Sequence, residues 1–144
     1  PYFVPDADIA TALRVAALQG IDVRILMPDK ADHWFTYLAA FGYFDELRNV
    51  GVQFWGYDVG FMHQKVLLVD DTIASVGTFN MDARSCRLNF ETTALFFDKD
   101  AAQDVATMLK ADFAQSHLLA TPLSEQPLWI RLGAPGARLF APLL

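Results

Sequence analysis

Apolar side chains recur at helical spacing in three stretches of the chain. The first stretch follows Asp6 or Asp8, either of which can cap a helix, and it ends before Gly20, which suits the position just after a helix. A second helix is predicted over about 32–50 and a third over about 98–114, each with an apolar side that can face a core. We therefore expect three amphipathic helices.

Short β-rich runs separate these helices, and several of them are bounded by Pro, Gly or paired Asp residues. Strands are predicted at 2–4, 21–27, 52–55, 64–69, 72–76 and 91–97. The run 64–69, Gln-Lys-Val-Leu-Leu-Val, is largely apolar on both faces, which is typical of a strand in the middle of a covered sheet. Strands that alternate with helices predict an α/β fold, in which a mixed β-sheet is covered by helices on both faces.

Composition favours one packed domain over residues 1–144. Of the 144 residues, 53% are apolar and 19% are charged, a balance typical of globular proteins and unlike that of disordered ones. The 11 Lys and Arg against 17 Asp and Glu leave a net charge of −6. This acidity argues against nucleic acid as a partner, because phosphate binding relies on clustered cations. A single cysteine excludes an internal disulfide framework.

Two features of the chain bear on its cellular setting. No apolar run approaches the ~20 residues that cross a bilayer, and no signal peptide is visible, so the composition predicts a soluble chain without a transmembrane segment. The sequence starts with Pro1 in a strand-like run and without Met, as expected of a piece cut from a longer polypeptide.

Residues 119–144 form an apolar C-terminal tail that prolines break into short pieces. One reading is a tail that packs back onto the domain. The other is an interfacial segment, with Trp129 and Phe140 among lipid headgroups and with Arg131 and Arg138 facing phosphate. The sequence leaves both readings open.

Polar residues suited to catalysis lie around the apolar run 64–69. His63 and Lys65 are two residues apart, so on a strand they project from the same face about 6.6 Å apart, close enough to grip one phosphate. The imidazole can act as nucleophile or general acid near neutral pH, and the ammonium supplies a point charge for phosphoryl oxygens. Asp70 has the opposite parity to His63, so we expect it to face away and to hold the turn.

Two more residues complete this set. Asn80 offers a neutral amide donor, and Glu91 could hold the imidazole tautomer, as the acid of a catalytic triad does. Each residue taken singly has an ordinary structural explanation, such as a turn or a local cap. A Lys and a His beside an otherwise apolar strand nevertheless require a reason. No carboxylate cluster suggests a metal site.

The set resembles the signature of the phospholipase D superfamily, which is His-x-Lys-x4-Asp followed by Gly-[Ser/Thr]-x-Asn. The matching residues are His63, Lys65, Asp70, Gly77, Thr78 and Asn80. Thr78 stands where Ser is commoner and keeps the hydroxyl, and Glu91 falls where many members carry an acidic partner of the histidine. The resemblance implies a phospholipase D-like α/β/α sandwich.

A narrower resemblance covers nearly the whole chain. The stretches 1–6, 20–28, 43–47, 80–91 and 137–144 look like the C-terminal half of bacterial cardiolipin synthases. The resemblance implies a phosphatidyltransferase that moves a phosphatidyl group from one phosphatidylglycerol to another, giving cardiolipin and glycerol. It also implies a full-length protein in the bacterial inner (cytoplasmic) membrane, with membrane helices and a first catalytic half upstream.

The resemblance further implies a site shared by two motifs. One histidine forms a phosphohistidine, and the other protonates the departing alcohol, without metal or other cofactor. It assigns His63 to the acid–base role, phosphate binding to Lys65 and Asn80 with support from Thr78, and orientation of His63 to Glu91. Because the chain has one motif, the expected partners are the first half of the same polypeptide or a second copy in a dimer, together with phosphatidylglycerol and the membrane surface.

Other residues and functions remain open at this point. His33 and His117 lack a Lys two positions on and are expected to be structural or surface residues. Arg84 and Arg87 could meet a second lipid phosphate or form surface salt bridges. The alternative functions are a phospholipase D-type hydrolase, in which water replaces the acceptor alcohol, and a single-motif nuclease completed by homodimerisation. An isolated fragment without catalytic activity is a further reading.

Overall fold

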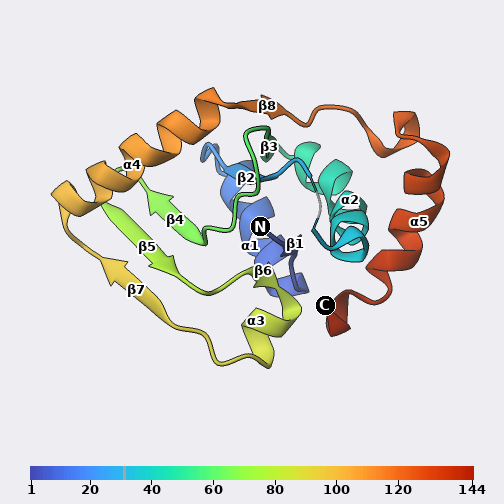
Figure 1. The fold of residues 1–144 in the computed structure, drawn as a ribbon, viewed down its shortest axis with the longest axis horizontal. Helices are drawn as coiled ribbons and strands as arrows, with labels where there is room; N and C mark the ends of the chain where they lie inside the picture. Colours follow the sequence, from blue (N-terminus) through green and yellow to red (C-terminus); the bar gives the residue numbers. More distant parts are fainter. Residues whose placement is uncertain (31) are drawn as a thin grey trace.

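Helices and strands alternate along most of the chain in the computed structural model, which describes residues 1–30 and 32–144 (Figure 1). The helices are α1 (Ala7–Leu18), α2 (Trp34–Arg48), α3 (Ala83–Arg87), α4 (Lys99–Ala114) and α5 (Leu128–Arg138). The strands are β1 (Phe3–Val4), β2 (Arg24–Pro28), β3 (Gln53–Tyr57), β4 (Val66–Val69), β5 (Ile73–Gly77), β6 (Met81–Asp82), β7 (Thr93–Phe96) and β8 (Ser116–Leu118). Short 3₁₀ helices cover Leu123–Glu125 and Ala141–Leu143. The mixed α/β class predicted from the sequence is confirmed.

Local sequence sets the ends of the helices. Asp6, rather than Asp8, caps α1, because its carboxylate accepts the backbone N–H of Ile9 at 2.9 Å. Asp98 caps α4 in the same way through the N–H of Ala101 at 2.9 Å. Gly20 follows α1 with a φ of +84°, a left-handed conformation that glycine adopts without steric cost.

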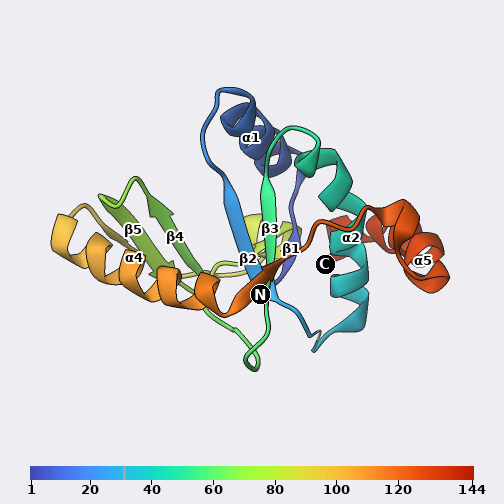
Figure 2. The same cartoon turned by 90° about the horizontal axis from the view of Figure 1, so that it is seen from above.

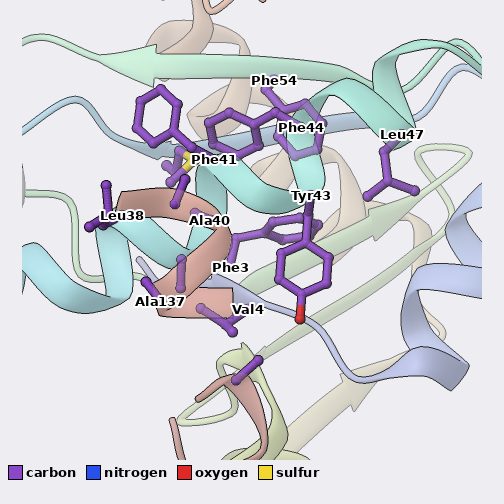
Figure 3. Packing of buried hydrophobic residues seen from close by; sticks show 14 of the residues in the cluster. Phe3, Val4, Leu38, Ala40, Phe41, Tyr43, Phe44, Leu47, Phe54 and Ala137 are labelled. Carbon is purple, nitrogen blue, oxygen red and sulfur yellow. The ribbon is translucent and has the colours of Figure 1, made fainter. Parts of the chain in front are cut away.

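The main core lies between α2 and the strands (Figure 3). Phe54 of β3 and Phe44 of α2 are almost completely buried, and their ring centroids are 4.5 Å apart. Phe3 of β1 packs edge-on against Phe54 at 5.2 Å. Aromatic rings bury large apolar areas and prefer such tilted geometry. This cluster fixes β1 and β3 against α2.

Helices lie on both faces of β3 (Figure 2). Successive side chains of a strand point to opposite faces. Phe54 meets Phe44 of α2, whereas the next residue, Trp55, packs edge-on against Phe113 of α4 at 5.6 Å. The two helices therefore cover opposite sides of this strand, in agreement with the layered arrangement expected from the sequence.

The strands are distributed over three small sheets. β2 pairs in parallel with β3, and β3 pairs antiparallel with β8. β4, β5 and β7 form an antiparallel sheet, and β1 pairs in parallel with β6. β4 is an edge strand of its sheet, and Leu67 is 50% exposed. The predicted position of this run in the middle of a covered sheet is wrong, because an apolar pattern records side-chain type and not whether another layer covers it.

The stretch after residue 119 contains a helix that the proline spacing did not predict. α5 continues through Pro135, although proline removes one backbone hydrogen bond inside a helix. Ile130, Ala134 and Ala137 form a buried face of α5 against α2. A Cβ at Gly133 would lie 2.7 Å from the Leu38 side chain, so glycine permits this close approach. Packing against α2 therefore compensates for the lost hydrogen bond.

No helix in the described part of the chain is both long and apolar enough to cross a membrane.

Candidate active site

His63 and Lys65 lie side by side immediately before β4. The Lys65 Nζ is 3.0 Å from the Nδ1 and 3.1 Å from the Nε2 of His63, and it donates a hydrogen bond to the His63 carbonyl oxygen at 2.9 Å. The shared orientation expected from their spacing is confirmed. An ammonium and an imidazole in contact can address the same phosphoryl group, one by charge and the other by proton transfer.

The surroundings of this pair differ for its two members. His63 is exposed, with its ring tilted against Phe61 at 5.7 Å between centroids. Lys65 is half-buried, and desolvation lowers its pKa, while the carboxylates of Glu91, Asp32 and Asp82 act in the opposite direction. The imidazole is therefore open to a reactant, and the ammonium stands in a less hydrated position where its charge acts more strongly.

A backbone hydrogen bond holds the second part of the motif beside Lys65. The N–H of Gly77, the last residue of β5, donates to the Lys65 carbonyl oxygen at 3.1 Å. On its other side, a Cβ at Gly77 would lie 2.4 Å from the Thr92 carbonyl oxygen. Only glycine fits at this distance without a shift of the backbone. The tight approach brings the stretch 77–80 next to the His63–Lys65 pair.

Lys65 and Asn80 line one cavity of about 460 Å³ between β2, β4 and α4. Much of its remaining wall is apolar and includes Leu26, Leu68 and Phe113. The Asn80 Oδ1 is buried and has no hydrogen-bond partner among the described residues. Buried polar atoms are normally paired. A half-turn of the amide would present its NH₂ group at the same place, so Asn80 can serve either an acceptor or a donor in a ligand.

Glu91 contacts the motif through Thr78. Its carboxylate accepts hydrogen bonds from the hydroxyls of Thr78 and Ser85 and from the side-chain amide of Asn89. The Thr78 bond is the main reason that the pKa of Glu91 lies below its usual 4.5. The described hydrogen bonds of Glu91 do not include His63, the contact expected from the sequence. Through these hydrogen bonds Glu91 holds the segment 78–91 together.

Thr78 also takes part in these hydrogen bonds. Its hydroxyl donates to Glu91 and accepts the backbone N–H of Thr92 at 3.0 Å. Contact of Thr78 with a phosphoryl oxygen, as expected from the sequence, would require its hydroxyl to exchange the bond to Glu91.

Asp70 lies at the opposite end of β4 from Lys65, in the turn to β5. Asp70 and Asp71 have φ values of +51° and +52°, and the Thr72 N–H donates to the Val69 carbonyl oxygen at 3.1 Å. Asp is one of the residues that tolerate this left-handed conformation. The predicted turn is confirmed, and Asp70 lines the same cavity as Lys65 from the other end of β4.

Arg87 forms salt bridges with residues near the N-terminus. Its guanidinium lies 2.7 Å from the Asp6 carboxylate and 3.1 Å from that of Asp8. Of the two readings of Arg87, the surface salt bridge is confirmed. The Arg84 side chain is exposed.

A polar cluster that sequence reasoning missed lies around Tyr2, near the N-terminus. The Tyr2 hydroxyl donates to the Asp32 carboxylate at 2.5 Å, and the Tyr2 ring lies 5.8 Å from that of His33. Tyr2 also lines the cavity that contains Lys65. No motif marked this cluster, because Tyr2 and Asp32 are thirty positions apart in the sequence and meet only in the folded chain.

A second cluster that was missed joins Asp29, Asp58 and His117. The His117 Nδ1 is 2.9 Å from the Asp58 carboxylate, and its Nε2 is 3.5 Å from that of Asp29. The ligand atoms lie within 4.8 Å of one another, a spacing that could hold a cation. Both ring nitrogens already face carboxylates, however, which favours a doubly protonated imidazolium that clamps β2, β3 and β8 together. His117 is thus structural, as expected from the sequence.

This clamp predicts a pH-dependent contribution to stability. The hydrogen bond to Asp58 raises the pKa of His117 above its usual 6.5. A raised folded-state pKa stabilises the fold fully below about 6.5, and the stabilisation disappears as the pH rises through the folded-state value. We expect the melting temperature of the unmodified chain, minus that of His117→Gln, to decrease across about pH 5.5–8.5. A difference that stays constant over this range would contradict the clamp.

The comparisons with known proteins agree with this site. Residues 1–113 match a family model described as cardiolipin synthase, phospholipase D-like domain. The chain is 45% identical over its whole length to the major cardiolipin synthase ClsA of Bacillus subtilis and spans 30% of that protein. The chain therefore covers about a third of the length of the curated relatives that it matches.

Solved structures support the same fold. Phosphatidylserine synthase from Haemophilus influenzae aligns with all of this chain and 40% of its own, with a TM-score of 0.73 and 16% identity. Nuc from Salmonella typhimurium, a phospholipase D family member, aligns with 83% of this chain and 78% of its own, with a TM-score of 0.70 and 22% identity. Because the family model matches most of its length, this chain belongs to the phospholipase D-like cardiolipin synthase family.

Proposed function

We propose that this chain supplies one half of a phosphatidyltransferase active site that forms cardiolipin from two molecules of phosphatidylglycerol. The observation that carries the proposal is the contact of the Lys65 ammonium with the His63 imidazole, in a chain 45% identical throughout to a cardiolipin synthase. The buried Oδ1 of Asn80, in the cavity that Lys65 also lines, adds an unpaired polar atom where a phosphate could bind.

In this proposal His63 is the acid and base of the transfer. A histidine from the other half attacks phosphorus, and the phosphorus–oxygen bond to glycerol breaks. His63 gives its proton to the departing glycerol oxygen. It then takes a proton from the hydroxyl of a second phosphatidylglycerol, whose oxygen attacks the phosphohistidine and releases the first histidine.

The remaining motif residues hold the phosphate and the site. Lys65 and Asn80 bind phosphoryl oxygens, and their charge and amide stabilise the additional negative charge of the transition state. Thr78 supports this binding by exchanging its bond to Glu91 for one to phosphate. Glu91 orients His63 once the other half is present, and Asp70 holds the turn that ends β4.

The other half is either the preceding part of a longer polypeptide or a second copy of this chain. The chain carries one His-x-Lys pair, at His63 and Lys65, so on this proposal it does not complete a two-histidine reaction alone. We further propose that the complete protein works at the bacterial cytoplasmic membrane, where its lipid substrate resides.

The test compares this chain with the complete polypeptide on phosphatidylglycerol in detergent. We expect cardiolipin and free glycerol in equal amounts from the complete polypeptide and neither from a monomeric preparation of this chain. Phosphatidic acid in place of cardiolipin would favour the hydrolase. Cleavage of plasmid DNA without added metal, by a dimer of this chain, would favour the nuclease. Cardiolipin formation by the strictly monomeric chain would overturn the half-site proposal.

A further inference from the structure

The outward face of α5 is apolar, which is unusual for a helix on a protein surface. We define the C-terminal apolar surface by the exposed large apolar side chains of α5 and of the residues after it. These are Leu128, Trp129 and Leu132 in α5, and Leu139, Phe140 and Leu143 after it. Each of them is between 52% and 81% exposed. At about 100° per residue, Leu128, Leu132 and Leu139 fall on one stripe, opposite the buried face of α5. In the described structure this stripe faces solvent.

Helix α4, which also lies on the surface, shows a more polar exposed face. The exposed residues of α4 are mostly polar, and they include Lys99, Asp100, Gln103, Asp104, Thr107 and Lys110. Single exposed apolar residues are normal, but a contiguous apolar patch marks an interaction site. The apolar outward face therefore distinguishes α5 from α4. Other exposed apolar side chains lie on the β4–β5–β7 sheet, among them Leu67, Val76 and Leu95.

Charge indicates which kind of surface this face would meet. Residues 126–144 contain two Arg and no Asp or Glu, in a chain whose net charge is −6. Arg138 is held against α2 by Glu46, at 3.0 Å, and by the Tyr43 ring. These contacts hold Arg138 against α2, whereas the interfacial reading of the tail expected Arg138 to face lipid phosphate. Arg131 is exposed next to the apolar stripe. An exposed apolar face with a Trp and a flanking cation suits an anionic lipid surface.

The C-terminal apolar surface is continuous with the edge that carries the candidate site. The Phe140 ring packs against Phe35 at 5.8 Å between centroids, and Phe35 packs against Trp34 at 5.6 Å. Trp34 is 68% exposed and starts α2 directly after His33, whose ring lies beside Tyr2. Tyr2 lines the same cavity as Lys65. A series of aromatic side chains therefore leads from α5 to the cavity that Lys65 lines.

We propose that the C-terminal apolar surface, together with Trp34 and Arg131, docks this domain on the surface of an anionic phospholipid membrane beside the candidate site. This inference rests on the proposed function, because it names where that site meets its lipid. Trp129 and the leucines enter the headgroup region, Arg131 contacts lipid phosphate, and the edge with Tyr2 and Lys65 faces the bilayer.

The test measures binding of this chain to vesicles in the absence of turnover. Vesicles of phosphatidylglycerol mixed with phosphatidylcholine are compared with phosphatidylcholine alone, by flotation and by the shift of Trp fluorescence. We expect the double variant Trp129→Ser/Leu132→Ser to bind at least about tenfold more weakly. Arg131→Gln should lose about fivefold, on the anionic vesicles only. Leu18→Ser is the matched control, because Leu18 is 67% exposed on α1, outside this surface, and it should bind like the unmodified chain.

The other outcomes either overturn the docking surface or separate it from the proposed function. Folded chain, verified by its melting transition, that does not bind anionic vesicles would overturn it, as would equal binding by the double variant. A change of oligomeric state in the double variant, measured by analytical ultracentrifugation, would assign the surface to protein contact instead. Vesicle binding without cardiolipin formation by the complete polypeptide would reject the proposed function and leave the docking surface intact. Turnover of detergent-dispersed lipid without vesicle binding would reject only the docking surface.

Discussion

Replacing His63 by Asn in the complete polypeptide is expected to lower the rate of cardiolipin formation by at least about 10³-fold. Asn resembles the imidazole in polarity, yet it cannot carry a proton between the two glycerol oxygens near neutral pH. His63 is exposed at the site, so the substitution should leave the melting temperature within a few degrees of the original. The measurement is the release of glycerol and the formation of cardiolipin from phosphatidylglycerol.

His117→Asn is the control for this variant. It replaces a second exposed histidine by the same residue and affects the clamp with Asp29 and Asp58 rather than the site. We expect turnover close to that of the unmodified enzyme at a temperature well below melting. Retained turnover in His63→Asn would remove His63 from the mechanism.

Replacing Lys65 by Met is the second change with a large expected effect. Met has a similar length and removes the only charge that contacts the His63 ring among the described side chains. Loss of a positioned charge that stabilises a transition state costs about 10²–10³-fold in rate. Because burial lowers the pKa of Lys65, the ammonium is partly desolvated, and a neutral Met should be tolerated by the fold.

Lys99→Met is the matched control, since Lys99 is an exposed lysine in the first turn of α4. The decisive readout is kcat/KM on phosphatidylglycerol, with melting curves to separate activity from folding. A Lys65→Met enzyme with kcat/KM equal to that of Lys99→Met would contradict the role of the ammonium.

Local features of the structure were predictable where neighbouring residues decide them. The caps at Asp6 and Asp98 depend on carboxylates that reach the backbone N–H three residues on, and the turn at Asp70 depends on residues that tolerate a positive φ. The contact of His63 with Lys65 follows from the alternation of side chains along an extended segment. The signature resembled that of the phospholipase D superfamily for the same reason, because all of its residues lie within one stretch of the chain.

Features that join distant segments were not predictable. The clamp of His117 with Asp29 and Asp58 unites three strand ends, and nothing near residue 117 marks it. Glu91 was expected to contact His63, yet its hydrogen bonds are to Thr78, Ser85 and Asn89. The α5 helix crosses Pro135 because its small buried residues pack on α2, a partner that begins almost a hundred residues earlier.

Features that depend on neighbouring residues could therefore be predicted from the sequence, whereas features that depend on the packing of distant segments could not. The sequence by itself determined the helices α1, α2 and α4, the turn at Asp70, the pairing of His63 with Lys65 and the resemblance to a family, since each depends on short-range geometry or on a local motif. Only the tertiary structure decided that β4 lies at a sheet edge, that the Asn80 Oδ1 is buried without a partner in the cavity that Lys65 also lines, and that α5 presents its leucines to the outside. Burial and exposure depend on which other segments cover a residue, and the distant packing of the chain alone settles that.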